Sequence, residues 1–501
     1  MPPSKSRHAP PRAAAMIEAL RGLGYSTAAA LADIIDNSIT ARAANVDVTF
    51  LWGVGVAVVT VQDDGDGMDD HELDRAMRLG EQSPLDERAQ HDLGRFGLGL
   101  KTASFSQCRR LTVATRKAGL TSCLRWDLDV LAASADDGWH LLEGAADGSS
   151  PFLAPLESVE HGTIVLWEVL DRIVSPGFRE QDFLDIIDAV ERHLGMVFHR
   201  FVSGARSRLH LSINGRLVRP WNPFLTENPV TWSSPVDSIQ SPGGNVEVQC
   251  HVLPHKDRLE LSEYEVAAGP DGWTAQQGFY VYRNERLLVA GTWLGLGRGR
   301  SWTKEEAHRL ARIRVDIPNT ADFAWKIDIR KSTARPPVEI RERLTRLAED
   351  TRERARRVFA HRGQPTNSGS REPVIQAWRV EHFSGGLRYR IDETHEAVRS
   401  VLENGGPLNP QIRAMLRIIE ATLPVQRIWL DTADARETPR TGFAGDPPAE
   451  VAAVLSVMYR NMVLRRGVSP ALAREQLLRT DPFHQYPELV IGLPDDPAET
   501  E

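Results

Sequence analysis

Apolar residues near the N-terminus recur at helical spacing. One helical stripe ends at Gly22 and Gly24, and Ser26 is placed to cap a second helix that runs to about Ala44. The first eleven residues are polar and rich in proline, and we expect them to be disordered. The pattern therefore predicts two consecutive helices over residues 12–44.

Alternating β-branched residues follow these helices. Residues 46–51 and 56–61 flank Gly53-Val54-Gly55 and predict a β-hairpin. Residues 69–80 predict a short helix with a capping box that ends near Gly80, and the polar stretch 81–96 predicts a mobile loop. Further elements are expected as strands at 110–116, 120–127 and 163–168, a helix starting near Leu98 and a helix at 180–202.

A second set of strand-like runs begins after residue 205. These runs cover 208–213, 246–252, 279–282 and 313–317. Pro336-Pro337 then opens a long helix to about His361, whose polar face carries mixed charge. We interpret that face as solvated with i,i+4 ion pairs, and a DNA-facing stripe is the alternative.

The pattern divides the chain into successive parts. We expect a disordered N-terminus (1–11), a first domain (12–204), a second domain (205–335), a long helix (336–362), a linker (363–372) and a C-terminal domain (373–501). Helical stripes at 412–419 and 451–462 predict that this last part is mostly helical.

Composition narrows the class of protein. The 501 residues are 41% hydrophobic and 26% charged, as in ordinary globular proteins, and the net charge of -8 gives no global sign of nucleic-acid binding. Three dispersed cysteines favour a reducing compartment and form no metal-ligand cluster. With no apolar run near the length of a membrane span and no signal-peptide core, we expect a cytoplasmic protein without a membrane partner.

Three short motifs in the first hundred residues carry candidate chemistry. In the first, Asp33 and Asn37 lie four residues apart and share one face of a predicted helix. A carboxylate there can orient or deprotonate a water molecule, and the amide oxygen of Asn37 can ligate Mg²⁺ beside phosphate oxygens. A solvated or capping acidic pair is the structural alternative.

The second motif is Asp63-Asp64-Gly65-Asp66-Gly67, at the end of a strand. Its first carboxylate can accept a hydrogen bond from the exocyclic amine of adenine, while Gly65 and Gly67 let the backbone pass close to the base. A calcium loop is the alternative, but no glutamate stands at its twelfth position.

The third motif, Gly94-Arg95-Phe96-Gly97-Leu98-Gly99-Leu100-Lys101, precedes a predicted helix. Its amides and the positive end of the helix dipole would hold phosphates, and Lys101 could add a point charge. The motif is not a dinucleotide fingerprint, since no strand leads directly into it, and the chain has no Walker-type loop.

Together these motifs resemble the GHKL ATPases with the Bergerat nucleotide fold, which include gyrase B subunits, MutL and histidine kinases. Asp33 stands where that superfamily has the glutamate of its Glu-x-x-x-Asn box, and Gly162-Thr163 resembles its fourth motif. Within the superfamily, residues 31–38 and 325–337 resemble the bacterial MORC-like (paraMORC) group. The resemblance covers residues 12–360.

The resemblance implies an α+β fold: a Bergerat α/β-sandwich ATPase domain, a split βαβ transducer domain and a mostly helical C-terminal region. It implies ATP and Mg²⁺ as cofactors, Asp33 as the activator of water, Asn37 as the metal ligand and residues 81–100 as a lid. Lys326, Arg330 and Lys331 are candidates for a cation that meets the γ-phosphate, with Lys331 favoured by its place in a loop. The expected nucleotide contacts are Asp63, Gly65, Gly67, Met68, Gly94, Phe96, Gly97, Gly99, Lys101 and Thr163.

The function that the resemblance implies is an ATP-hydrolysing, ATP-dependent homodimeric clamp. It would act on DNA or with a nuclease or helicase-like partner protein, in a DNA-related, anti-phage or restriction-like defence system. A chaperone-like remodelling ATPase and a non-hydrolysing ATP-sensing switch are the alternatives. The switch follows from one departure: aspartate replaces the usual glutamate and sets the carboxylate about one methylene further from the water.

Overall fold

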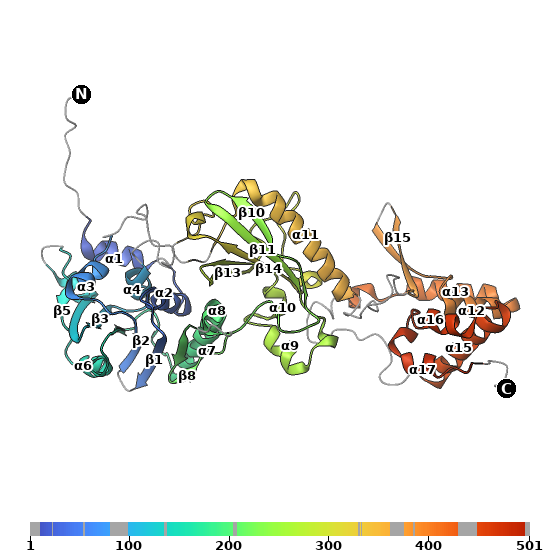
Figure 1. The fold of residues 1–501 in the computed structure, drawn as a ribbon, viewed down its shortest axis with the longest axis horizontal. Coiled ribbons are helices and arrows are strands. Elements are labelled where there is room, and N and C mark those ends of the chain that lie inside the picture. Colours follow the sequence, from blue (N-terminus) through green and yellow to red (C-terminus); the bar gives the residue numbers. More distant parts are fainter. Residues whose placement is uncertain are drawn as a thin grey trace, which may run out of the picture. The chain divides into compact units, whose positions relative to one another are not determined.

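The computed structural model describes most of the chain in two compact units, residues 1–363 and 364–501 (Figure 1). The described residues are 11–22, 24–53, 56–80, 99–134, 138–203, 208–328, 331, 333–360, 375–383, 386–428 and 448–495. The expected α+β class is confirmed. Among the described helices, none is both long and apolar enough to cross a membrane.

The first unit contains an eight-stranded sheet with the order β5-β4-β3-β6-β2-β1-β7-β8. All neighbouring strands are antiparallel except β1 and β7, which are parallel. The strands are β1 Asn45–Gly53, β2 Val56–Asp63, β3 Arg110–Lys117, β4 Leu120–Asp127, β5 Leu142–Glu143, β6 Gly162–Glu168, β7 His210–Ile213 and β8 Arg216–Leu217. The predicted hairpin at 46–61 is confirmed as β1 and β2.

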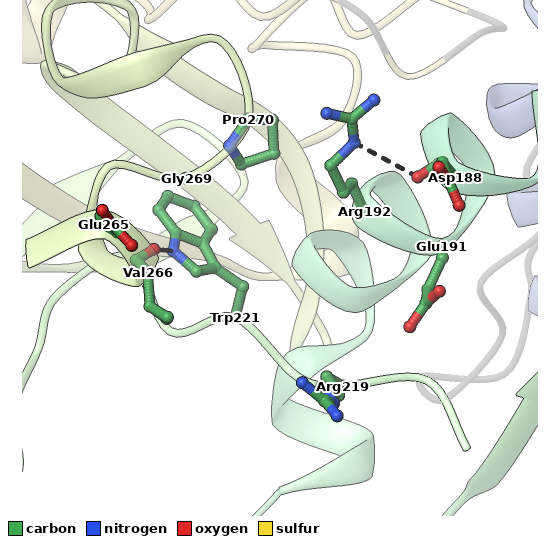
Figure 2. A pocket seen from close by; sticks show the side chains of 9 residues that line it. All are labelled: Asp188, Glu191, Arg192, Arg219, Trp221, Glu265, Val266, Gly269 and Pro270. Carbon is green, nitrogen blue, oxygen red and sulfur yellow. Dashed lines mark hydrogen bonds between the residues drawn. The ribbon is translucent and has the colours of Figure 1, made fainter. Parts of the chain in front are cut away.

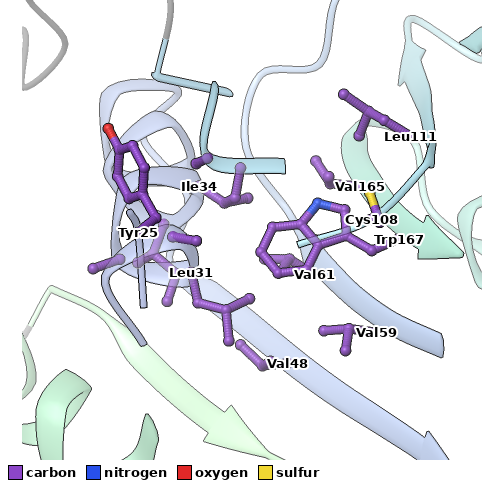
Figure 3. Packing of buried hydrophobic residues seen from close by; sticks show 14 of the residues in the cluster. Tyr25, Leu31, Ile34, Val48, Val59, Val61, Cys108, Leu111, Val165 and Trp167 are labelled. Carbon is purple, nitrogen blue, oxygen red and sulfur yellow. The ribbon is translucent and has the colours of Figure 1, made fainter. Parts of the chain in front are cut away.

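Helices bury their apolar stripes against this sheet. The core combines residues from α1 (Ala13–Arg21), α2 (Thr27–Thr40), α4 (Gly99–Phe105) and α7 (Glu180–Val197) with the strands. Figure 3 shows Leu31 of α2 near Val48 and Val61 of the sheet. Each fully buried side chain of this size contributes about 1.5–3 kcal/mol. The smaller helices are α3 Asp70–Met77, α5 Leu128–Ala133, α6 Ser150–Leu153, η1 Ala154–Ser158 and α8 His199–Val202.

Local capping fixes where the key helices begin. Ser26 Oγ accepts a hydrogen bond from Ala29 N at the start of α2, as the sequence predicts. Asp69 and Glu72 form the predicted capping box of α3. The strand at 162–168, β6, is buried along its whole length, because the α6–η1 segment covers its other face through Leu156.

A second, six-stranded sheet follows in the same unit. Its main order is β10-β11-β14-β12-β13, with β9 pairing to β11, and β12 and β14 are parallel. The strands are β9 Trp232–Ser233, β10 Asp237–Ser241, β11 Gly244–Val252, β12 Gly278–Arg283, β13 Arg286–Thr292 and β14 Ala311–Ile317. The accompanying helices are η2 Lys256–Arg258, α9 Leu261–Ala267, α10 Gly272–Ala275, η3 Glu306–His308, η4 Asn319–Ala321 and α11 Val338–Ala360.

The long helix α11 lies against this second sheet and buries Ile340, Leu344 and Ala348 in its core. On its polar side Arg346 pairs with Glu342 and Arg357 with Glu353, each at i,i+4. The predicted i,i+4 pairing is therefore present at these two pairs, but the predicted solvation holds only in part, because Arg352 is buried and lies over the rings of Trp293 and Trp302.

One strand differs from the expectation. Residues 208–213 were expected to open the second domain, but β7 pairs in parallel with β1 and so extends the first sheet. Parallel pairing joins segments far apart in the chain, so the local pattern of Leu209, Leu211 and Ile213 cannot reveal its partner.

The C-terminal unit is mostly helical, as predicted, and has its own core of Leu455, Met458, Met462 and Leu477. It also contains a hairpin, β15 (Trp378–Phe383) and β16 (Gly386–Ile391), that the sequence analysis missed. Its helices are α12 Glu396–Asn404, η5 Gly406–Leu408, α13 Asn409–Ala421, α15 Ala449–Arg460, η6 Asn461–Arg465, α16 Pro470–Leu477, η7 Phe483–Gln485 and α17 Pro487–Ile491.

Candidate functional site

Helix α2 carries the first set of candidate residues. Asp33 and Asp36 are buried, with exposed fractions of 4% and 1%, whereas Asn37 is exposed. Asn37 Nδ2 donates to the backbone carbonyl of Asp33 at 3.0 Å. This contact uses the amide nitrogen of Asn37, and the hydrogen bonds of the described residues include none to its oxygen. An exposed amide oxygen beside buried carboxylates suits the oxygen coordination that Mg²⁺ prefers.

Two cations from the second sheet's part of the unit reach these carboxylates. Lys331 Nζ lies 3.0 Å from Asp33 Oδ1 and 2.5 Å from Asp36 Oδ2. Arg286 Nε lies 3.2 and 3.1 Å from the two carboxylate oxygens of Asp36, and its Nη2 lies 3.6 Å from Asp33 Oδ1. Burial alone would raise the pKa of Asp36, but the charges of Arg286 and Lys331 outweigh it and lower that pKa.

Tyr25 completes the surroundings of Asp33. Its hydroxyl donates to Asp33 Oδ2 at 3.0 Å, and burial together with the charge of Asp33 raises the pKa of Tyr25. Gln107 Nε2 donates to the Tyr25 carbonyl at 3.3 Å and holds this residue before α2 begins. Both oxygens of Asp33 are therefore engaged, one by Tyr25 and one by Lys331.

Asp63 ends β2 and is 7% exposed. Its Oδ2 accepts from Ser38 Oγ at 2.7 Å, and its Oδ1 accepts from Gly65 N at 3.0 Å. Burial raises the pKa of Asp63, although these two hydrogen bonds oppose the rise. A second lone pair on each oxygen suits a further donor such as an adenine amine.

The glycine loop after Asp63 is confined by close backbone contacts. Gly67 has φ +67°, and a Cβ there would lie 1.9 Å from the Arg116 carbonyl oxygen. Met68 N donates to Thr115 Oγ1 at 2.9 Å, and Thr115 Oγ1 lies 3.1 Å from Thr163 Oγ1. The structure thus brings Asp63, Met68 and Thr163 together at adjacent strands, β2, β3 and β6.

The remaining candidates differ in their placement. Gly99 begins α4, and a Cβ there would lie 3.8 Å from Asp33 Oδ2, so the start of this helix lies beside the Asp33 carboxylate. Lys101 is 3% exposed, and its Nζ donates to the Ala76 carbonyl at the end of α3 at 2.7 Å. Lys326 is exposed, whereas Lys331 is buried. The candidates Gly94, Phe96, Gly97 and Arg330 lie outside the described residues.

The sequence analysis missed Arg286. It stands 250 positions from Asp36 in the chain, and its local signal is only the turn Asn284-Glu285 between two strands. The left-handed φ of both turn residues, 47° and 68°, is typical of a two-residue hairpin turn. Nothing in that turn points to a buried partner on α2.

A separate concave region lies between α7 and α9 (Figure 2). It has a volume of about 420 Å³ and mixes apolar residues with charges of both signs. Trp221 Nε1 donates to the Val266 carbonyl at 2.9 Å, which fixes the indole on one wall. The lining contains none of the residues that the sequence predicted for nucleotide or metal.

Comparison with known proteins shows what the first region is similar to. Residues 25–163 match the model of the histidine kinase-, DNA gyrase B- and HSP90-like ATPases. A segment of 95 residues, 19% of the chain, is 30% identical to the ATPase morc-1 of Caenorhabditis elegans. A segment of 123 residues, 24% of the chain, is 33% identical to the DNA mismatch repair protein MutL of Rhodospirillum rubrum. These segments span only 11% and 17% of the two relatives' own lengths.

Proposed function

We propose that this chain binds ATP with Mg²⁺ and hydrolyses it, because residues 25–163 match the model of the histidine kinase-, DNA gyrase B- and HSP90-like ATPases. The observation that carries the proposal is the meeting of Asp33, on α2, with Lys331, which lies 298 positions later in the chain. A buried carboxylate and a buried lysine at the edge of one site are the groups that water activation and γ-phosphate recognition require.

The residues take distinct parts in this proposal. Asp63 accepts from the adenine amine, while Gly65 and Gly67 let the loop pack against Ala41 and the Arg116 carbonyl and so hold Asp63 in place. Asn37 holds Mg²⁺, which when bound neutralises charge on the phosphates. Asp33 orients the attacking water and takes its proton, and Lys331 stabilises the negative charge that develops on the transferred phosphoryl group.

Replacing Asp63 tests nucleotide recognition. Asp63→Asn presents an amide in place of a buried acceptor, so ATP affinity should fall roughly ten- to a hundredfold. Asp66→Asn is the matched control, because Asp66 lies in the same loop but is half exposed and pairs with Arg42. Equal ATP affinity in wild type and Asp63→Asn, measured by calorimetry, would contradict the proposed adenine site.

Replacing Asp33 tests catalysis. Phosphate release with Mg-ATP should fall on the order of a hundredfold or more in Asp33→Ala, as for loss of a general base. Asp74→Ala on α3, whose carboxylate forms an exposed ion pair with Arg78, serves as the control. Undiminished phosphate release in Asp33→Ala would show that Asp33 takes no part in hydrolysis.

A second candidate function is an ATP-sensing switch without turnover. It is favoured by the engagement of both Asp33 oxygens, by Tyr25 and by Lys331, which leaves the short carboxylate no oxygen without a donor. Tight ATP binding without phosphate release, in wild type as in Asp33→Ala, would favour the switch over the enzyme.

We further propose that ATP drives homodimerisation and that the dimer acts on DNA or with a nuclease or helicase-like partner in defence. The support is the similarity to a DNA mismatch repair protein and to a MORC ATPase. Light scattering with and without a non-hydrolysable ATP analogue tests the dimer, and filter binding of duplex DNA under the same two conditions tests the clamp. A chaperone-like ATPase would dimerise on the analogue but retain no DNA.

A further inference from the structure

Arg286 is placed where the second sheet's hairpin meets α2. It is the first residue of β13, directly after the Asn284-Glu285 turn. Its side chain is 4% exposed, and its Nη1 donates to the Leu287 carbonyl at 2.8 Å. That contact fixes the guanidinium on its own strand, while Nε faces both oxygens of Asp36. Such a charge-assisted contact is stronger and more directional than one to a neutral group.

Asp33, Asp36, Arg286 and Lys331 form a buried ion cluster with no net charge. Asp33 and Asp36 carry two negative charges, Arg286 and Lys331 carry two positive charges, and all four side chains are at most 8% exposed. Asp36 has both cations as neighbours, whereas Asp33 has Lys331 at 3.0 Å and Arg286 only at 3.6 Å. Asp36 is therefore the carboxylate that can lose Lys331 and still keep a close cation.

The proposed function requires Lys331 to turn from one of its two carboxylates toward the γ-phosphate. Asp33 stays beside Lys331 in that function, so the contact to be given up is the one with Asp36, and a buried carboxylate without a partner is costly. Arg286 lowers that cost because it remains on Asp36 after Lys331 moves. We propose that Arg286 is a positioning residue that releases Lys331 from Asp36 for the γ-phosphate, so that the protein distinguishes ATP from ADP; this rests on the proposed function.

ATP and ADP differ in whether they offer Lys331 a new partner, and this difference determines their relative affinities. ADP lacks the γ-phosphate and gives Lys331 nothing in exchange for Asp36, so its affinity is independent of Arg286. ATP gains the contact with Lys331 only if the free-energy cost of separating Lys331 from Asp36 is small. Its affinity therefore depends on Arg286. A ligand can shift such an equilibrium only through this difference in affinity.

The test measures the affinities of the full chain for ADP and for AMP-PNP, a non-hydrolysable ATP analogue, by calorimetry. Wild type should prefer AMP-PNP, and Lys331→Met should abolish the preference. Arg286→Met should reduce the preference on the order of tenfold, within the range of coupling between two sites, and leave ADP affinity unchanged. Asp36→Asn/Arg286→Met should restore the preference, since it leaves no unpaired carboxylate at position 36.

Controls separate positioning from folding. Arg343→Met removes an exposed pair with Asp237 at the second sheet and should change neither affinity. Asp36→Asn is a second variant for the case in which Arg286→Met does not fold. It weakens the hold on Lys331 while Arg286 stays, so the preference for AMP-PNP should rise roughly threefold or more.

The outcomes are distinguishable. A preference that is undiminished in Arg286→Met, or unchanged in Asp36→Asn, overturns the role of Arg286 and leaves the proposed function standing. Equal losses of ADP and AMP-PNP affinity in folded Arg286→Met also overturn it, because the residue is then structural. Wild type that binds neither nucleotide overturns the proposed function and this inference together.

Discussion

Asp33 is buried and hydrogen-bonded by side chains that lie outside its sequence motif. The carboxylate is 4% exposed and accepts from both Tyr25 and Lys331. Lys331 itself has a left-handed backbone, φ 53°, which is uncommon for residues other than glycine. Order of this kind suits a site in which small displacements change the chemistry.

Tyr25→Phe tests the hydroxyl on Asp33. The variant removes a donor to a buried charged group, so the free energy of unfolding should fall by about 1.5–3 kcal/mol. Urea denaturation measures this loss. Tyr389→Phe, at an exposed position of β16, should change the free energy by less than about 0.5 kcal/mol. Equal effects of the two variants would show that the Tyr25 hydroxyl does not stabilise the site.

Gly67→Ala tests the backbone of the glycine loop after Asp63. A Cβ there would overlap the Arg116 carbonyl at a left-handed φ, so the loop must move. Gly119 is the matched control, since it also has a left-handed φ, +77°, but no atom within 4 Å of its Cβ position. Alanine should cost about 1 kcal/mol at Gly119 and several kcal/mol at Gly67. Thermal unfolding compares them, and similar midpoints would contradict the clash.

At the scale of elements, α2 joins the stability of the first sheet to the candidate site. Its apolar side packs Leu31 and Ile34 into the core, while Asp33 and Asp36 lie in the buried ion cluster. The register of this one helix therefore sets the position of every charge on it. A change in the first turn of α2 should therefore alter the positions of Asp33 and Asp36.

Ser26→Ala tests how much the cap stabilises this helix. Loss of the cap on Ala29 N should lower the free energy of unfolding by about 1 kcal/mol. Ser26→Gly is the conservative comparison and should cost only a few tenths of a kcal/mol, because glycine is tolerated at this position. Both values come from urea denaturation, and a larger loss in the glycine variant would argue against capping as the cause.

The whole molecule divides into two units with separate cores. Residues 1–363 contain both large sheets and all the described candidate residues, whereas 364–501 have their own core around Leu455 and Met458. A chain ending at residue 363 should therefore fold and bind AMP-PNP with the affinity of the full chain, within about threefold. Calorimetry on both chains measures this, and loss of binding on truncation would place a needed contact in the C-terminal unit.

Local patterns in the sequence predicted the elements better than their partners. The Ser26 cap, the hairpin of β1 and β2 and the capping box at Asp69 depend on residues a few positions apart, and each was correct. The parallel partner of β7 and the contact of Arg286 with Asp36 join distant segments and leave no local trace. The hairpin β15–β16 was not predicted, although its local pattern is present in the sequence: apolar residues alternate from Trp378 and from Leu387, on either side of two glycines.

The contacts of the candidate site residues followed the same division. The sequence placed Asp33, Asn37 and Asp63 in their motifs, and the structure puts Lys331, the favoured cation, on Asp33. It gives Lys101 a backbone carbonyl partner at the end of α3, a contact that a glycine-rich motif cannot foretell. Side chains as long as lysine reach several neighbours, so their final contact depends on packing rather than on spacing.

The ion cluster also constrains how this chain can change by recombination. Two of its charges come from the region that matches a family of ATPases, and the two that neutralise them come from Arg286 and Lys331, outside that region. A graft that replaced the later segment with an unrelated one would leave two interior acids without counterions. A replacement of either part must therefore supply the matching charges, even though each sheet has its own core.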